Sequence, residues 1–123
     1  MKTLITIDFD DTLCFDNDIT KINRPLERFI KDLNKKGCEF LIVTARNKEY
    51  DNIYAKTNIN KFLEKYKLPI YDIVYTDGDL KGKKLKSLNS YLHIDNDADQ
   101  ISDCKKEGIR TLFVKKSKAI KCK

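Results

Sequence analysis

The sequence predicts an α/β protein with a three-layer, Rossmann-like fold, in which a mostly parallel sheet of five strands lies between helices. Two observations favour this class. Short apolar segments alternate with helical patterns along the chain of 123 residues, and polar residues cluster directly after several of these segments. Strands and helices alternate in this way when helices connect parallel strands. Such sheets bind ligands at the carboxyl ends of their strands, so we expect a site there.

The first expected strand, residues 2–7, leads straight into a group of carboxylates. It alternates and then becomes apolar, as a buried strand does. Asp8, Asp10 and Asp11 follow at once. Carboxylates this close repel one another unless a cation, a proton or a positive group lies among them. Because the net charge of the chain is +6, composition does not explain this acidic cluster, and a divalent metal ion is the simplest explanation.

The next segments continue the alternation of helix and strand. Pro25 suits a first helical turn, and the helix that it opens is expected to end at Gly37. Residues 40–43 form a continuous apolar run, typical of a strand buried on both faces of a parallel sheet, and Thr44 follows them. We expect a helix over 48–66, broken near residues 57 and 58. The remaining elements are expected as a strand at 70–75, a lysine-rich helix at 81–88, a strand at 91–94, a helix at 98–106 and a strand at 109–114.

The length and composition favour one compact domain, residues 1–115, followed by a basic tail at 116–123 that we expect to be disordered. No segment approaches the roughly 20 apolar residues that cross a bilayer. The four cysteines show no CxxC spacing, which fits reduced thiols. We therefore expect a soluble, cytoplasmic protein without a membrane partner.

Basic residues outnumber acidic ones by 25 to 19, but the lysines are spread along nearly every predicted helix. This distribution favours a solvated surface over a nucleic-acid interface, so nucleic acid stays an alternative partner that is not favoured. The positive balance would still attract an anionic substrate.

The polar residues that end the predicted strands all belong to the same edge of the sheet. Carboxylates, a hydroxyl and an ammonium around an oxygen-ligated cation are the groups that phosphoryl transfer needs. They are Asp8, Asp10, Asp11 and Thr12 after the first strand, Thr44 after the second, Asp95, Asn96, Asp97 and Asp99 after the fourth, and Lys81, Lys83 and Lys84 in the helix before it.

On these residues the sequence resembles the haloacid dehalogenase superfamily, whose members are mostly magnesium-dependent phosphatases with the signature DxDxT. Here Asp8, Asp10 and Thr12 match that signature, and three further landmarks follow in the family's order. The resemblance implies that Asp8 takes the phosphoryl group as an aspartyl phosphate and that Asp10 acts as acid and then as base. Thr44, in LIVTAR, would hydrogen-bond the transferring phosphoryl group.

The resemblance also implies a lysine and a metal site. Lys81 stands fourteen residues before Asp95, as in small capless members, although Lys83 and Lys84 compete for this role. Mg²⁺ would be held by Asp8, Asp10 through its backbone carbonyl, and Asp95, with Asp99 as a further acid. Asn96 stands where many relatives carry an acid, and the role of Asp97 stays open. Thr12, Arg46 and Lys84 are expected to bind the substrate, although Thr12 could instead cap a helix and Arg46 could form a surface salt bridge.

The short segment between Thr12 and Pro25 has no room for a cap domain, so the resemblance is to small uncapped members that include nucleotidases. We expect a phosphatase with a phosphorylated small-molecule substrate, a nucleotide or a phosphosugar. The alternatives are a phosphatase of nucleic-acid ends or another macromolecule, and a non-catalytic phosphate-binding module. The sequence fits a response-regulator receiver less well, because receivers lack an early DxDxT signature. The oligomeric state and the physiological substrate stay open, and His93 is expected in the core or an interface.

Overall fold

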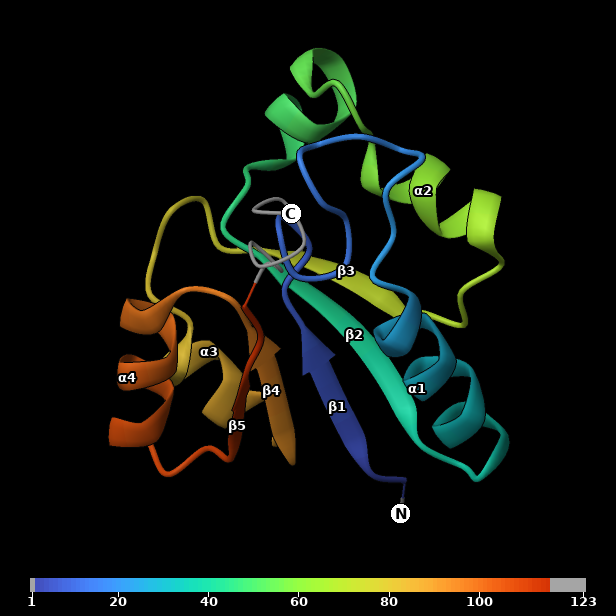
Figure 1. The fold of residues 1–123 in the computed structure, drawn as a ribbon. Helices are drawn as coiled ribbons and strands as arrows, with labels where there is room; N and C mark the ends of the chain where they lie inside the picture. The colour runs from blue at the N-terminus through green and yellow to red at the C-terminus, as the bar shows by residue number, and fades with distance from the viewer. Residues whose placement is uncertain (1, 116–123) are drawn as a thin grey trace, which may run out of the picture.

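The computed structural model describes residues 2–115, and the predicted basic tail at 116–123 lies outside the described residues. Five strands form one sheet in the order β3-β2-β1-β4-β5, with every neighbouring pair parallel (Figure 1). The predicted fold class is confirmed, and the sheet is parallel throughout. The strands are β1 (Leu4–Ile7), β2 (Glu39–Thr44), β3 (Asp72–Tyr75), β4 (Leu92–Asp95) and β5 (Thr111–Phe113).

Helices cover both faces of this sheet, as Figure 1 shows. On one face, Ile5 and Ile7 of β1 lie beside Phe40 and Ile42 of β2, and all four belong to the main core with α1 and α2. On the other face, a smaller core joins Val43 to α3 and α4. The helices are α1 (Arg24–Lys35), α2 (Ile59–Tyr66), α3 (Gly82–Ser87) and α4 (Ala98–Lys106).

Local signals set the helix boundaries on the first face. Asn23 caps α1 by accepting a hydrogen bond from the Leu26 amide, and Pro25 lies in the first turn. The predicted helix at 48–66 is divided into a π-helical turn, η1 (Tyr50–Tyr54), and α2. The break falls where it was predicted because the side chain of Asn58 accepts from the Lys61 amide and caps α2. Both η1 and the loop after β1 lie beyond the carboxyl ends of the strands (Figure 1).

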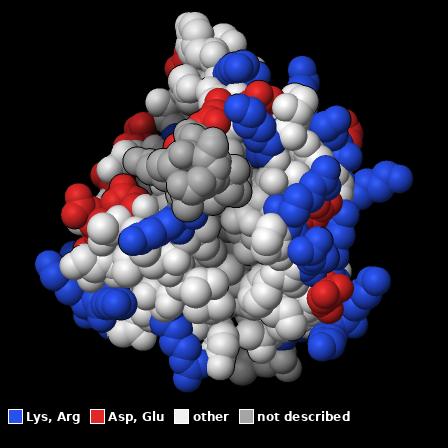
Figure 2. Space-filling view, in the orientation of Figure 1, with Lys and Arg blue, Asp and Glu red and all other residues white. Residues whose placement is uncertain are grey.

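The segment between β1 and α1 is a small flap instead of a cap domain. Isolated bridges join Asp10 to Cys14 and Cys14 to Ile22, which fold the flap back on itself. Among the described residues, no helix is long and apolar enough to cross a membrane. Lysine and arginine side chains lie around the margin of the face drawn in Figure 2, with acidic side chains among them, instead of forming one patch.

Candidate active site

Two carboxylates and one ammonium meet where β1 and β4 end. Ile7 pairs with Ile94, so Asp8 and Asp95 stand side by side on neighbouring strands. Nζ of Lys81, the residue before α3, lies 2.8 Å from Asp8 Oδ1 and 2.8 Å from Asp95 Oδ2. Lys81 and Asp95 are buried, and Asp8 is 7% exposed. The structure thus brings together three of the residues that the sequence singled out, and it places Lys81, not Lys83 or Lys84, between the carboxylates.

These charges lie on the wall of an open cavity of about 500 Å³. Burial raises the pKa of Asp8, although the charge of Lys81 opposes the shift. Burial also acts to raise the pKa of Asp95, but hydrogen bonds from His93 and Lys81 outweigh it and hold that pKa below its usual range. Asp95 is therefore the firmly ionised partner of Lys81. The lining residues are Asp8, Asp10, Asp11, Ala45, Lys81, Asp95, Asn96, Asp97, Ala98 and Gln100.

Thr12 and Asn96 contact Asp8 from the other side. Thr12 Oγ1 is buried and donates to Asp8 Oδ2 over 2.9 Å, so this hydroxyl lies behind Asp8. The amide head of Asn96 lies 3.0 Å from Asp8 Oδ2 and 3.2 Å from the carbonyl oxygen of Asp10. With its nitrogen turned toward these atoms the amide donates to both.

The carboxylates predicted to hold Mg²⁺ do not form a ready-made cage. Within residues 2–115, no three Asp, Glu, His or Cys side chains gather as a metal site. The Asp10 side chain turns toward Arg46, and Asp99 is exposed in the first turn of α4, outside the lining of the cavity. An oxygen atom that suits magnesium, that of the Asp10 carbonyl group, nevertheless lies beside Asp8, since the Asn96 amide contacts both. The residues that would fit the ion are therefore Asp8, Asp95 and the carbonyl group of Asp10, without Asp99.

Thr44 ends β2 and Arg46 lies just after it, and neither side chain lines the cavity. Thr44 is 1% exposed, and its hydroxyl accepts from the Arg46 amide over 3.2 Å. The Arg46 guanidinium forms two hydrogen bonds with Asp10, from Nε over 2.8 Å and from Nη2 over 2.7 Å. It forms a further ion pair with Asp51, a buried residue that sequence reasoning missed.

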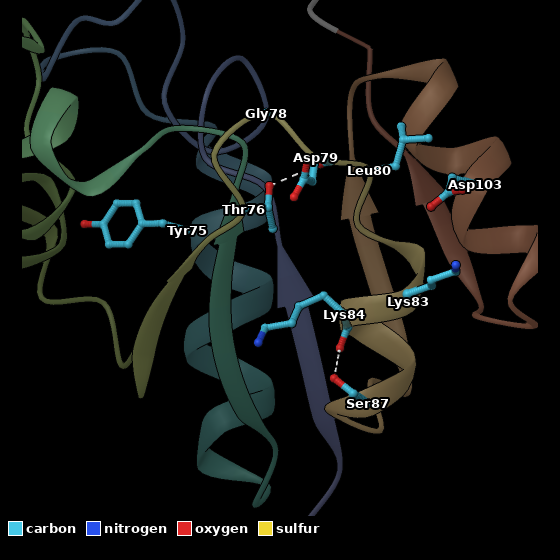
Figure 3. A pocket seen from close by; sticks show the side chains of 9 residues that line it. All are labelled: Tyr75, Thr76, Gly78, Asp79, Leu80, Lys83, Lys84, Ser87 and Asp103. Atoms are coloured by element: carbon cyan, nitrogen blue, oxygen red, sulfur yellow. Dashed lines mark hydrogen bonds between the residues drawn. The ribbon is translucent and has the colours of Figure 1, made fainter.

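Lys84 lies apart from the carboxylates. With Lys83 it lines a second hollow of about 970 Å³, whose lining comes from the loop after β3, from α3 and from α4 (Figure 3). Its side chain extends over the sheet, whereas that of Lys83 points toward α4 (Figure 3). The second hollow also contains Thr76, whose hydroxyl donates to the Asp79 carbonyl group over 3.2 Å.

Two further polar residues support the site from behind. His93 is fully buried, as predicted for a core histidine, and its Nε2 lies 2.8 Å from Asp95 Oδ2. His93 and Asp95 are two residues apart on β4, so the alternation of side chains along a strand places them on one face, and this spacing was a usable signal. Gln100 Oε1 accepts from the Lys81 amide over 2.9 Å, a contact between distant elements that no local pattern indicates.

Known proteins resemble this chain in sequence over about half of its length and in fold over nearly all of it. The family profile of the haloacid dehalogenase-like hydrolases matches residues 5–67, which include Asp8, Asp10 and Thr44. Lys81 and Asp95 lie beyond that match. No curated protein matches the chain.

Solved structures match the fold at low sequence identity. A chain of the Pnkp1/Rnl/Hen1 complex has a TM-score of 0.75 at 15% identity, covering 94% of this chain and 46% of that chain. The core domain of a protein named as a candidate phosphoglycolate phosphatase from Streptococcus pneumoniae TIGR4 has a TM-score of 0.55 at 14% identity. That match covers 95% of this chain and 83% of that chain. A universal stress protein in complex with cAMP has a TM-score of 0.56 at 14% sequence identity, and the match covers 94% of this chain and 98% of that chain. The chain spans less than half of the Pnkp1-complex chain, and these likenesses establish the fold alone.

Proposed function

We propose, because this chain belongs to the haloacid dehalogenase-like hydrolases, that it is a magnesium-dependent phosphatase that hydrolyses phosphomonoesters through an aspartyl phosphate on Asp8. The observation that carries the proposal is the buried contact of Lys81 with both Asp8 and Asp95. A nucleophilic carboxylate and a fixed cation at the end of a central parallel strand are the groups that a phosphoryl acceptor needs.

The reaction would take place in two steps. In the first, an oxygen of Asp8 attacks phosphorus while the bond to the leaving oxygen breaks and that oxygen takes a proton from the Asp10 carboxyl group. In the second, water attacks the phosphorus of the aspartyl phosphate, Asp10 takes the proton of the water, and the bond to the Asp8 oxygen breaks. Lys81 stays protonated throughout because, although burial acts to lower its pKa, the charges of Asp8 and Asp95 raise it.

A magnesium ion, when bound, supplies positive charge that offsets the negative charge of the phosphoryl oxygens. The groups that would hold it are Asp8, the carbonyl group of Asp10 and Asp95. Asp99 is too peripheral in the structure to be placed with them.

A generic aryl phosphate assayed with Mg²⁺ tests the proposal. We expect turnover by the wild type and loss of at least 10³-fold in the Asp8→Asn variant, since Asn cannot form the acyl phosphate. Asp32→Asn makes the same change of charge and size on the exposed face of α1 and should leave the rate unchanged. No turnover on any phosphomonoester, or equal rates in wild type and Asp8→Asn, would show that the mechanism is wrong and would favour a non-catalytic phosphate-binding module.

The substrate class that we propose first is a small phosphomonoester, a nucleotide or a phosphosugar. The second candidate is a phosphorylated nucleic-acid end, which the likeness to a chain of a complex named for RNA repair supports. That chain matches with a TM-score of 0.73 at 13% identity, over 96% of this chain and 44% of its own length. A panel of nucleotides, sugar phosphates and oligonucleotides phosphorylated at either end separates the two by their kcat/KM values.

A further inference from the structure

We infer that Arg46 is a positioning residue that fixes the orientation of the Asp10 carboxyl group, and that it does not bind the substrate. The inference rests on the proposed function, because it concerns the group that would donate and accept the proton. It replaces the sequence-based expectation that Arg46 contacts the substrate.

Every N–H group of the Arg46 side chain is already used within the protein. A guanidinium carries five N–H donors. Two of them bind the two oxygens of Asp10, from Nε and Nη2. The second N–H of Nη2 donates to Asn17 Oδ1 over 3.2 Å, and Nη1 donates to Asp51 Oδ1 and to the Thr57 carbonyl group, each over 2.8 Å. No donor is left for a phosphate oxygen, and the side chain is only 4% exposed.

The far side of the guanidinium is held by a rigid support. Asp51 is 1% exposed, and besides Arg46 it accepts from the Ile59 amide over 3.0 Å and from the Tyr75 hydroxyl over 2.6 Å. The Phe9 and Tyr50 rings flank the guanidinium, with their centroids 5.0 and 5.4 Å from Cζ. These contacts fix the plane of the guanidinium independently of Asp10.

Asp10 differs from its partner in exposure, since its side chain is 44% exposed and lines the cavity. A bidentate pair between a fixed guanidinium and an exposed carboxylate sets the plane of the carboxylate. A proton-transfer group must be held within hydrogen-bond reach of the reacting oxygen in both steps. Arg46 would therefore act on the reaction only through Asp10.

Leaving groups of different basicity provide the test. p-Nitrophenolate departs without a proton, whereas the alkoxide of an alkyl phosphate such as glycerol phosphate requires one. In Arg46→Gln we expect kcat/KM for glycerol phosphate to fall by about ten- to a hundredfold, part of the contribution of a general acid. For p-nitrophenyl phosphate, kcat/KM should change less than threefold. Hydrolysis of the phosphoenzyme still needs Asp10 as the base, so a burst of about one p-nitrophenol per enzyme should precede slow turnover.

Two further variants separate positioning from folding. Tyr75→Phe removes one support of Asp51 but leaves the Arg46–Asp10 pair, so it should show the same selective loss on glycerol phosphate as Arg46→Gln but a smaller one. Arg46→Lys keeps the charge but cannot form the bidentate pair, so it should show the same selective loss as Arg46→Gln with a melting temperature close to that of the wild type. If Arg46→Gln fails to fold, the kinetics of Arg46→Lys test the inference instead.

An equal loss of kcat/KM on both esters, or a rise in KM alone, would overturn the inference while the proposed function stands. Wild-type rates on glycerol phosphate in Arg46→Gln or Arg46→Lys would overturn it in the same way. If the wild type hydrolyses no phosphomonoester, the proposed function fails and this inference fails with it.

Discussion

Lys81 determines the charge balance of the site at the scale of single residues. Its ammonium is the only cation within hydrogen-bond reach of Asp8 and Asp95 among the described residues. The spacing of the sequence left Lys81, Lys83 and Lys84 as competitors, because a short lysine-rich segment has no clear helical phase. The structure distinguishes them, since Lys81 precedes the first turn of α3 and is buried while the other two are exposed on the helix.

Asp8→Asn should stabilise the folded chain above pH 6 and have little effect near pH 4. Burial raises the pKa of Asp8 from its ordinary value of 3.8 to about 6. The folded state thus binds this proton more readily than the unfolded state does, so the free energy of unfolding falls as the pH rises from about 4 to 6 and stays lower above 6. The asparagine does not titrate and so removes this loss in the free energy of unfolding, which is of order 1–3 kcal/mol.

Urea denaturation of both proteins between pH 4 and 8, in the presence of a chelator, measures this difference. Asp32→Asn serves as the control and should show no trend across that range. A difference that stays constant with pH, or that is largest near pH 4, would contradict the assignment of the raised pKa to Asp8.

At the scale of elements, the contact between α3 and α4 holds Lys81 in place. Gly82 begins α3, and its amide donates to Asp103 Oδ2 on α4 over 2.8 Å. A Cβ atom at this position would lie 2.5 Å from Asp103 Oδ2 and 2.8 Å from the Asp103 carbonyl oxygen. Because a backbone atom is among these contacts, a rotamer change alone cannot relieve them.

Gly82→Ala is therefore expected to destabilise the protein by about 1–3 kcal/mol and to lower phosphatase activity, because the displaced helix start carries Lys81. Thermal unfolding and the aryl phosphate assay measure the two effects. Gly37→Ala is the matched control: its Cβ meets open space, its φ of +101° adds strain, and it lies at the other end of the sheet. It should lose stability without losing activity at temperatures where it is folded, and a fully active Gly82→Ala would show that α3 does not position Lys81.

The elements that the sequence predicts well are those with a strong local pattern. The apolar run at 40–43 and the carboxylates after Ile7 located β2, β1 and the edge of the sheet that carries the candidate site, because burial on both faces and strand ends are local properties. The partners of Arg46 could not be predicted in the same way. Asp51 lies in a π-helical turn, which the helical pattern of the sequence did not indicate, and Thr57 contacts the guanidinium through its backbone carbonyl group, which carries no sequence signal.

At the scale of the whole molecule, the fold class followed from the alternation of elements, but the directions of two acidic side chains did not. The sequence placed Asp99 close to the other acids of the site and left the partner of the Asp10 carboxylate open. The folded chain leaves Asp99 on the surface and turns the Asp10 side chain toward Arg46. Side-chain direction at a strand end depends on neighbours from distant segments, and this information is absent from the spacing of the acids.

Magnesium should raise the melting temperature of the wild type by several degrees at millimolar concentration, because an ion that binds only the folded state stabilises it. Asn96→Ala removes the amide that contacts Asp8 and the Asp10 carbonyl group and so helps to orient both, and it should weaken this shift while the chain stays folded. Differential scanning fluorimetry with added MgCl₂ measures both. An equal shift in the wild type and in both Asn96→Ala and Asp8→Asn would place the ion elsewhere.

The position of β1 in the middle of the sheet has a consequence for the growing polypeptide. The strand that carries Asp8 pairs with β2 on one side and β4 on the other. During translation, β1 and β2 leave the ribosome long before residues 81–95, so Asp8 is made well before the segment that carries Lys81 and Asp95. The Asp8 carboxylate gains its lysine counter-charge only when this later segment has emerged and inserted beside it, and the proposed hydrolysis would begin only at that late stage of synthesis.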